Sequence, residues 1–150
     1  MTSEAGWEIT EHTADVGIRA WGPSAADALS RAALGMLALV VPAERVRPIR
    51  RWAVEVSAPD PDLLLFNLLD ELLYRHHVEG LLAHDVAAEV AAAGGPGGAA
   101  GGWVARAAVR GEPVDTARHR PGPEIKAVTL HGISLRPEGG QWVARVVVDL

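Results

Sequence analysis

The sequence contains no cysteine, which excludes disulfide bonds, thiolate metal ligands and a cysteine nucleophile. Its apolar runs are far shorter than a membrane span and have charged residues nearby. The first residues, Met1–Trp7, contain neither a basic segment nor an apolar run, so we expect no secretory signal. Nucleotide-binding, zinc-protease and serine-hydrolase fingerprints are missing as well. These absences favour a cytoplasmic protein without membrane association.

Basic residues are outnumbered, with 14 Lys and Arg against 19 Asp and Glu and a net charge of −5. Direct binding to a nucleic-acid backbone needs clustered positive charge, so we expect contact with RNA only indirectly, through a basic partner. Lysine is nearly absent, and Lys126 is its single occurrence. The 16 glycines and many alanines accompany an excess of arginine, which genome composition can explain.

The 150 residues are 49% hydrophobic, enough for one domain over residues 1–150 with a substantial core. Ser24 resembles a helix cap, and apolar residues at helical spacing follow it up to Pro42. Asp60 and Pro61 start a second helix, expected from Leu63 to about Tyr74. Alternating residues predict strands near 15–22, 51–57, 81–93, 103–111, 125–135 and 142–149. The order indicates an α+β fold with two helices packed on a mostly antiparallel sheet.

The stretch 11–22 places an acidic residue at the start of a strand. Asp15 is followed by Val16, Ile18 and Ala20 on one face, with the intervening residues on the other. A rigid strand can aim that carboxylate at a ligand. Thr and Asp before a strand also form ordinary hydrogen-bonded turns, so both interpretations stay open.

A second carboxylate, Asp149, ends the last expected strand. If this strand and the one after Asp15 are antiparallel neighbours, the two carboxylates meet at one edge of the sheet. Carboxylates, backbone carbonyls and water are the ligands that hard divalent cations prefer, and His12 could join them. Alternatively, Asp149 pairs with an arginine or faces water.

Other polar residues gather in two further segments. In the segment 124–132, Thr129 and His131 share one strand face and could line a polar pocket, although a lone strand histidine is more often structural. Residues 111–123 read as a polar loop that contains Glu112, Asp115 and His119. His76, His77 and His84 are interpreted as structural. The glycine-rich stretch 94–102 is interpreted as a flexible hairpin tip.

Several segments together resemble the archease family over nearly the whole chain. They are the stretch from Glu11 to Gly17 with Trp21-Gly22, the stretch 63–74, the stretch 109–115 with His119, the stretch 124–129, and the stretch 142–150. The Gly/Ala-rich insertion at 94–102 departs from the family pattern, as do Leu130 and the run 67–70. None of these departures affects the acidic positions.

The resemblance implies a strand-helix-strand-strand unit with an inserted second unit. It also implies a non-enzymatic cofactor of the tRNA-splicing RNA ligase, which uses GTP and divalent metal. Such a cofactor accelerates guanylylation of the ligase's active-site histidine and promotes multiple turnover. A divalent ion (Ca²⁺, Mg²⁺ or Mn²⁺) is expected at Asp15, Asp149 and the main chain of Leu150. Residues that could lie near the metal or contact the ligase are His12, Glu112, His119, Lys126, Thr129 and His131.

Two other functions remain open from the residues alone. One is a stand-alone metal-dependent phosphoesterase or phosphotransferase that uses the same acids, although the sequence nominates no nucleophile for it. The other is a chaperone-like adaptor for an RNA-modifying enzyme, in which the metal is purely structural.

Overall fold

The protein has two antiparallel sheets, and the larger one contains both Asp15 and Asp149. The computed structural model describes residues 4–11, 15–92 and 102–150. In the five-stranded sheet the order is β1 (Gly6–Glu11), β2 (Asp15–Gly22), β8 (Gln141–Asp149) and β6 (Ala127–Val128), and β7 (Ser134–Glu138) also pairs with β8. The three-stranded sheet has the order β3 (Arg50–Ala58), β5 (Trp103–Pro113) and β4 (Leu81–Ala92).

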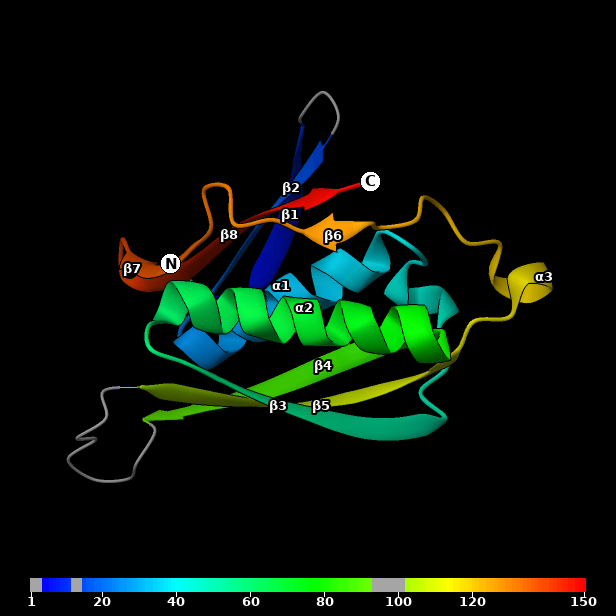
Figure 1. Ribbon diagram of the computed structural model, residues 1–150, viewed down its shortest axis with the longest axis horizontal. Coiled ribbons are helices and arrows are strands. Elements are labelled where there is room, and N and C mark those ends of the chain that lie inside the picture. Colours follow the sequence, from blue (N-terminus) through cyan, green and yellow to red (C-terminus); the bar gives the residue numbers. More distant parts are fainter. Residues whose placement is uncertain (1–3, 12–14, 93–101) are drawn as a thin grey trace.

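Two helices fill the space between the sheets (Figure 1). Helix α1 (Ala25–Ala38) packs against β2 and β8 on one side and β4 on the other. Helix α2 (Pro61–Glu79) contacts β3 and β5 of the smaller sheet and β6 and β7 of the larger one. The α+β class is therefore confirmed, with two sheets where the sequence suggested one. Helices that are apolar around most of their circumference need cover on two sides, and the second sheet supplies it.

Local signals set the helix ends. The Ser24 side chain accepts a hydrogen bond from the Asp27 amide at 3.1 Å, and Asp60 accepts one from the Leu63 amide at 2.9 Å. Gly80 ends α2 in the left-handed conformation at φ +69°, which glycine adopts without strain. Helix α2 thus extends five residues beyond the expected end at Tyr74, to Glu79.

Two expectations for the second half of the chain were wrong in detail. The expected strand 125–135 is two short strands, β6 and β7, because the chain turns at Gly132 with φ +66°. Residues 111–123 are only partly a loop, since β5 continues to Pro113 and the one-turn helix α3 (Thr116–His119) follows. A single-turn 3₁₀ helix, Ala43–Arg45, precedes β3.

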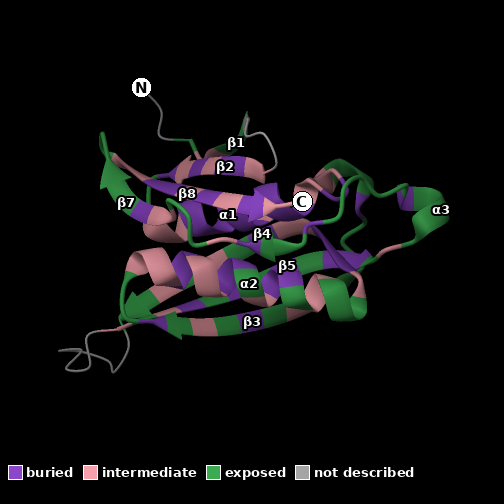
Figure 2. Ribbon diagram, turned by 45° about the horizontal axis from the view of Figure 1, so that its top comes forward, coloured by how far each residue is buried: buried purple, intermediate pink, exposed green. Residues whose placement is uncertain are grey.

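Strands β2 and β8 bury one face and leave the other partly open, as Figure 2 shows by their alternating colours. The buried face packs on α1. We call the opposite one the outer face; it carries Asp15, Gly17, Arg19 and Trp21 of β2 and Val143, Arg145, Val147 and Asp149 of β8. Strand β8 lies between β2 and β6, and most of its outer-face residues are half-buried rather than fully covered. Within the described residues, no helix is long and apolar enough to cross a membrane.

Candidate metal centre on the outer face of the larger sheet

Asp15 and Asp149 lie directly opposite each other on the antiparallel strands β2 and β8. The Asp149 carbonyl accepts a hydrogen bond from the Lys126 amide at 2.7 Å, so the backbone polar groups of Asp149 point toward β6. Asp15 and Asp149 are therefore a non-hydrogen-bonded pair. In such pairs the Cα atoms are about 4.5 Å apart and the side chains are closest. The pairing expected from the sequence is confirmed.

Two carboxylates in this position repel each other unless a cation lies between them. Like charges directly opposite on a sheet are destabilising. Both side chains are half-buried, and neither takes part in an ion pair within residues 4–11, 15–92 and 102–150. Oxygen ligands of this kind fit Ca²⁺, Mg²⁺ or Mn²⁺ better than soft metals. The arrangement therefore suits a hard divalent cation.

The remaining ligands of such a cation must come mainly from the main chain and water. In the part of the chain that the structure describes, no three histidine or acidic side chains lie so that together they could hold a metal ion. Leu150, which follows Asp149, is half-buried against the core and offers main-chain oxygens beside the pair. His12, the other expected contributor, lies outside the described residues. A site completed largely by water is usual for Mg²⁺.

Lys126 and Thr129 border this site through their backbone. Both the amide and the Oγ1 hydroxyl of Thr129 donate to the Val147 carbonyl, at 3.0 and 2.8 Å. The Lys126 amide and the two Thr129 donors therefore form the hydrogen bonds on the side of β8 that faces away from β2, next to Asp149. The Lys126 side chain is exposed. The Thr129 hydroxyl is bonded to β8 and holds that strand. Of the two residues expected to line a polar pocket, His131 lines a cavity on the outer face, and Thr129 is not part of its lining.

Glu112 and His119 lie in a different part of the molecule, at the end of the smaller sheet. Glu112 is 3% exposed and His119 is fully buried. One oxygen of Glu112 accepts from the Arg47 amide at 2.7 Å and from Nε2 of His119 at 2.9 Å, and the other accepts from the Arg118 guanidinium. Burial raises the pKa of Glu112, but these hydrogen bonds outweigh it and lower the pKa to about 2.

Comparison with known proteins identifies the family. Residues 7–150 match the model of the Archease protein family. The chain belongs to the archease family. Protein archease of Methanopyrus kandleri is 36% identical over 144 residues, which cover 96% of this chain and 99% of that protein. Protein archease of Thermococcus gammatolerans is 35% identical over 145 residues, covering 96% of this chain and 98% of that protein.

Solved structures share the archease fold. The solution structure of protein 1598 from Methanobacterium thermoautotrophicum matches with a TM-score of 0.83 and 28% identity, covering 97% of this chain and 99% of that one. A crystal structure from Thermotoga maritima, described as an archease and possible chaperone, has a TM-score of 0.58 and 17% identity. That match covers 94% of each chain and supports the fold alone.

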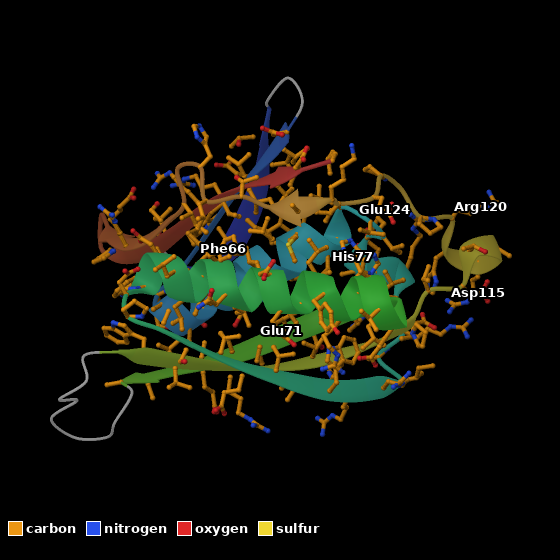
Figure 3. The ribbon with its side chains drawn as sticks, in the orientation of Figure 1. Phe66, Glu71, His77, Asp115, Arg120 and Glu124 are labelled. Carbon is orange, nitrogen blue, oxygen red and sulfur yellow. The ribbon has the colours of Figure 1, made fainter. Side chains whose placement is uncertain are left out.

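The three histidines interpreted as structural bind backbone carbonyls in this archease fold. His76 Nδ1 lies 3.0 Å from the Leu81 oxygen, His77 Nε2 lies 2.8 Å from the Ile125 oxygen, and His84 Nδ1 lies 2.8 Å from the Val46 oxygen. His77 and Glu124 line a cavity of about 540 Å³ between α2 and the segment before β6 (Figure 3). The three contacts with backbone carbonyls confirm that His76, His77 and His84 join elements of the fold.

A pair of arginines on the outer face went unnoticed in the sequence. Arg19 and Arg145 lie directly opposite each other, as Asp15 and Asp149 do. Glu8 and Glu138 each pair with one of them. A hydrogen bond from Arg145 is the main reason that the pKa of Glu138 is lowered, and the charge of Arg19 contributes. The signal in the sequence was spacing: each arginine lies four residues from an aspartate on the same strand.

Proposed function

We propose that this chain is a non-catalytic cofactor of a tRNA-splicing RNA ligase and that Asp15 and Asp149 hold a divalent cation for that partner. The observation that carries the proposal is the direct opposition of these two carboxylates on one sheet face. Membership of the archease family supports it. The role deduced for the pair is to bring a hard cation to the ligase when the two proteins dock.

In this proposal the chain's own residues bind and orient. Strands β2 and β8 fix the two carboxylates, while the Lys126 amide holds the carbonyl of Asp149 and so keeps β8 in register at its end. When bound, the cation supplies charge neutralisation at the GTP phosphates during guanylylation of the ligase histidine. The residues that make and break bonds belong to the ligase.

Net charge favours the proposed docking. A chain with net charge −5 and an acidic pair at one sheet edge complements a cleft that is basic because it binds RNA. Complementary potentials of this kind speed association and fix orientation. RNA then contacts this chain only indirectly, across the interface with the ligase.

A guanylylation assay tests the proposal. Purified ligase is incubated with limiting GTP and defined Mg²⁺ or Mn²⁺, with and without this protein, and the covalent ligase–GMP adduct is measured over time. We expect Asp15→Asn and Asp149→Asn each to reduce the stimulated rate at least about tenfold, which is about 1.4 kcal/mol of activation free energy. Glu55→Gln is the matched control, because Glu55 is an exposed acid on the smaller sheet.

Three other results would refute or redirect the assignment. Full stimulation by both Asp variants, with circular dichroism spectra unchanged, would refute the metal-presenting role. Hydrolysis of a phosphate ester by the protein without ligase, abolished by Asp149→Asn, would indicate a metal-dependent phosphoesterase instead. Ligase binding that survives chelation, together with metal-dependent thermal stability, would indicate a chaperone-like adaptor whose metal is structural.

A further inference from the structure

The outer face carries two like-charged pairs of opposite sign, with a cavity between them. Asp15 opposes Asp149, and Arg19 opposes Arg145 four residues away. At about 3.4 Å per residue, the two pairs lie about 14 Å apart along the strands. Gly17 and Val147 form the rung midway between the acidic and the basic pair. An acid end and a guanidinium end thus face solvent on one rigid surface.

The cavity has a volume of about 350 Å³ and lies over that middle rung. Its floor is apolar and includes Gly17 and Val147. The polar residues that line it are Thr10, Arg19, His131 and Arg145. Hydroxyl, imidazole and guanidinium groups are hydrogen-bond donors, and guanidinium matches phosphate oxygens with two parallel N–H groups. Its volume lies near the lower end of the range for small-molecule sites.

The two arginines retain donors for a ligand. A guanidinium has five N–H groups. Arg19 donates from Nη1 alone to Glu8, at 3.3 Å, and Arg145 donates from Nη1 and Nη2 to Glu138. The Glu8 and Glu138 side chains are 50% and 42% exposed, and exposed ion pairs contribute little to stability. A phosphate group can therefore bind the arginine N–H groups that the two glutamates leave unused.

We propose that this cavity binds a phosphate group of a metal-chelated polyphosphate, with the chelated cation held by Asp15 and Asp149. The inference extends the proposed function, because it assigns the phosphate side of the complex to Thr10, Arg19, His131 and Arg145. A divalent cation at the acidic pair neutralises the two carboxylate charges next to the cavity and removes their repulsion of phosphate, so the cation and the phosphate bind cooperatively. The small cavity and the acidic pair beside it favour a compact polyphosphate over an RNA strand, whose backbone needs extended positive charge.

Titration calorimetry on the isolated protein tests this inference with tripolyphosphate as the probe. With saturating Mg²⁺ we expect measurable binding that weakens at least tenfold without the metal and at least tenfold in the double variant Arg19→Gln, Arg145→Gln. The control is Arg51→Gln, Arg106→Gln, which removes two exposed arginines from the smaller sheet and leaves the affinity unchanged. Equal affinity of both double variants would overturn the inference, as would no binding by the wild type.

Amide chemical shifts of the wild-type protein provide a second measurement, which needs no variant to fold. Tripolyphosphate with Mg²⁺ should shift the signals of Gly17, His131, Gly132 and Val147 and leave β3 and β4 unchanged. Shifts confined to other regions would contradict the site. A 3′-phosphorylated RNA trinucleotide that binds here while tripolyphosphate and GTP do not would overturn the polyphosphate assignment.

The inference and the proposed function fail separately. If the wild type does not bind tripolyphosphate but still stimulates the ligase, only the cavity assignment is refuted. Tripolyphosphate binding with no ligase stimulation removes the proposed function and leaves the cavity assignment standing.

Discussion

Nε2 of the buried His119 lies 2.9 Å from a carboxylate oxygen of Glu112 and donates a hydrogen bond to it. The donor is fixed by the other ring nitrogen, because Nδ1 accepts from the Asp115 amide at 2.8 Å and so carries no proton. The His119 carbonyl in turn accepts from the Arg45 guanidinium at 3.0 Å. The hydrogen bond to Glu112 thus holds α3 to β5. The bond from Arg45 holds the end of α3 to the 3₁₀ helix.

Glu112→Gln should destabilise the protein by about 3 kcal/mol, because the amide group of glutamine faces donors that need an acceptor. Urea unfolding at pH 7 measures the loss. Glu89→Gln is the control, since Glu89 is exposed on the neighbouring strand and its change should stay within about 0.5 kcal/mol. Equal midpoints for the two variants would show that the buried carboxylate contributes nothing.

The same residue predicts a pH dependence. The pKa of Glu112 is lowered from 4.5 to about 2 in the folded protein. A lowered pKa contributes stability that is fully present above the unfolded value and is lost as the pH falls toward the folded value. The wild type should therefore lose stability relative to Glu112→Gln between about pH 4.5 and pH 2. Parallel stability curves for the two proteins over that range would contradict the assignment.

Asp15→Asn should have opposite effects with and without divalent metal. In chelator it removes the repulsion from Asp149 and should stabilise the fold by about 0.5 kcal/mol. With metal at 100 times its dissociation constant, the wild type gains about 2.7 kcal/mol, and the variant should lose most of that gain. Thermal melts in both conditions measure this reversal. Glu55→Gln should behave like the wild type, and an equal metal effect in all three proteins would exclude the acidic pair as the site.

Gly111→Ala should be among the most damaging single changes. A Cβ atom at Gly111 would lie 1.8 Å from the Leu82 carbonyl oxygen, a backbone atom next to the irregularity in β4 between Ala83 and Asp85. The strands must separate to admit it, so we expect a loss of at least about 3 kcal/mol. Gly139→Asn is the control at a turn with φ +57° and no atoms within 4 Å of the added Cβ, where about 1 kcal/mol is expected. Similar unfolding midpoints would contradict the close approach.

Asp62→Asn should loosen β7 without unfolding the molecule. One Asp62 oxygen accepts from the Leu135 amide at 2.8 Å and the other from Arg136 at 2.9 Å, which holds β7 to the first turn of α2. The hydrogen bond from Arg136 is the main reason that the pKa of Asp62 is lowered. We expect a loss of about 1 kcal/mol and faster amide hydrogen exchange at Leu135. Asp70→Asn, on the exposed side of α2, should leave that exchange rate unchanged.

Several features of the site could be read from the sequence because they depend on close neighbours. The alternation after Asp15 and before Asp149 identified the two strands that carry the carboxylates, and the apolar face of those strands is buried as that alternation requires. The starts of α1 and α2 at Ser24 and Asp60 likewise follow from hydrogen bonds within three residues. The end of α2 was expected near Tyr74 and lies at Glu79. His76, His77 and His84 were also interpreted correctly as structural.

Other features depended on partners that the local sequence does not name. Glu112 reads as a polar loop residue, yet it is buried because Arg47, Arg118 and His119 converge on it from separate segments. The chain turns at Gly132 between β6 and β7, and the two strands then pair with β8 at separate positions. Neither arrangement leaves a periodic signal.

The sequence by itself determined where the two long helices begin, which segments form the longer strands, and that two aspartates stand at strand ends. Those properties arise from side-chain periodicity and from hydrogen bonds between near neighbours in the chain. Only the tertiary structure decided that Asp15 faces Asp149, that Arg19 faces Arg145, and that a second sheet covers the helices. Strand register is set by contacts between residues more than a hundred positions apart, and a shift of one residue would have moved these side chains to opposite faces.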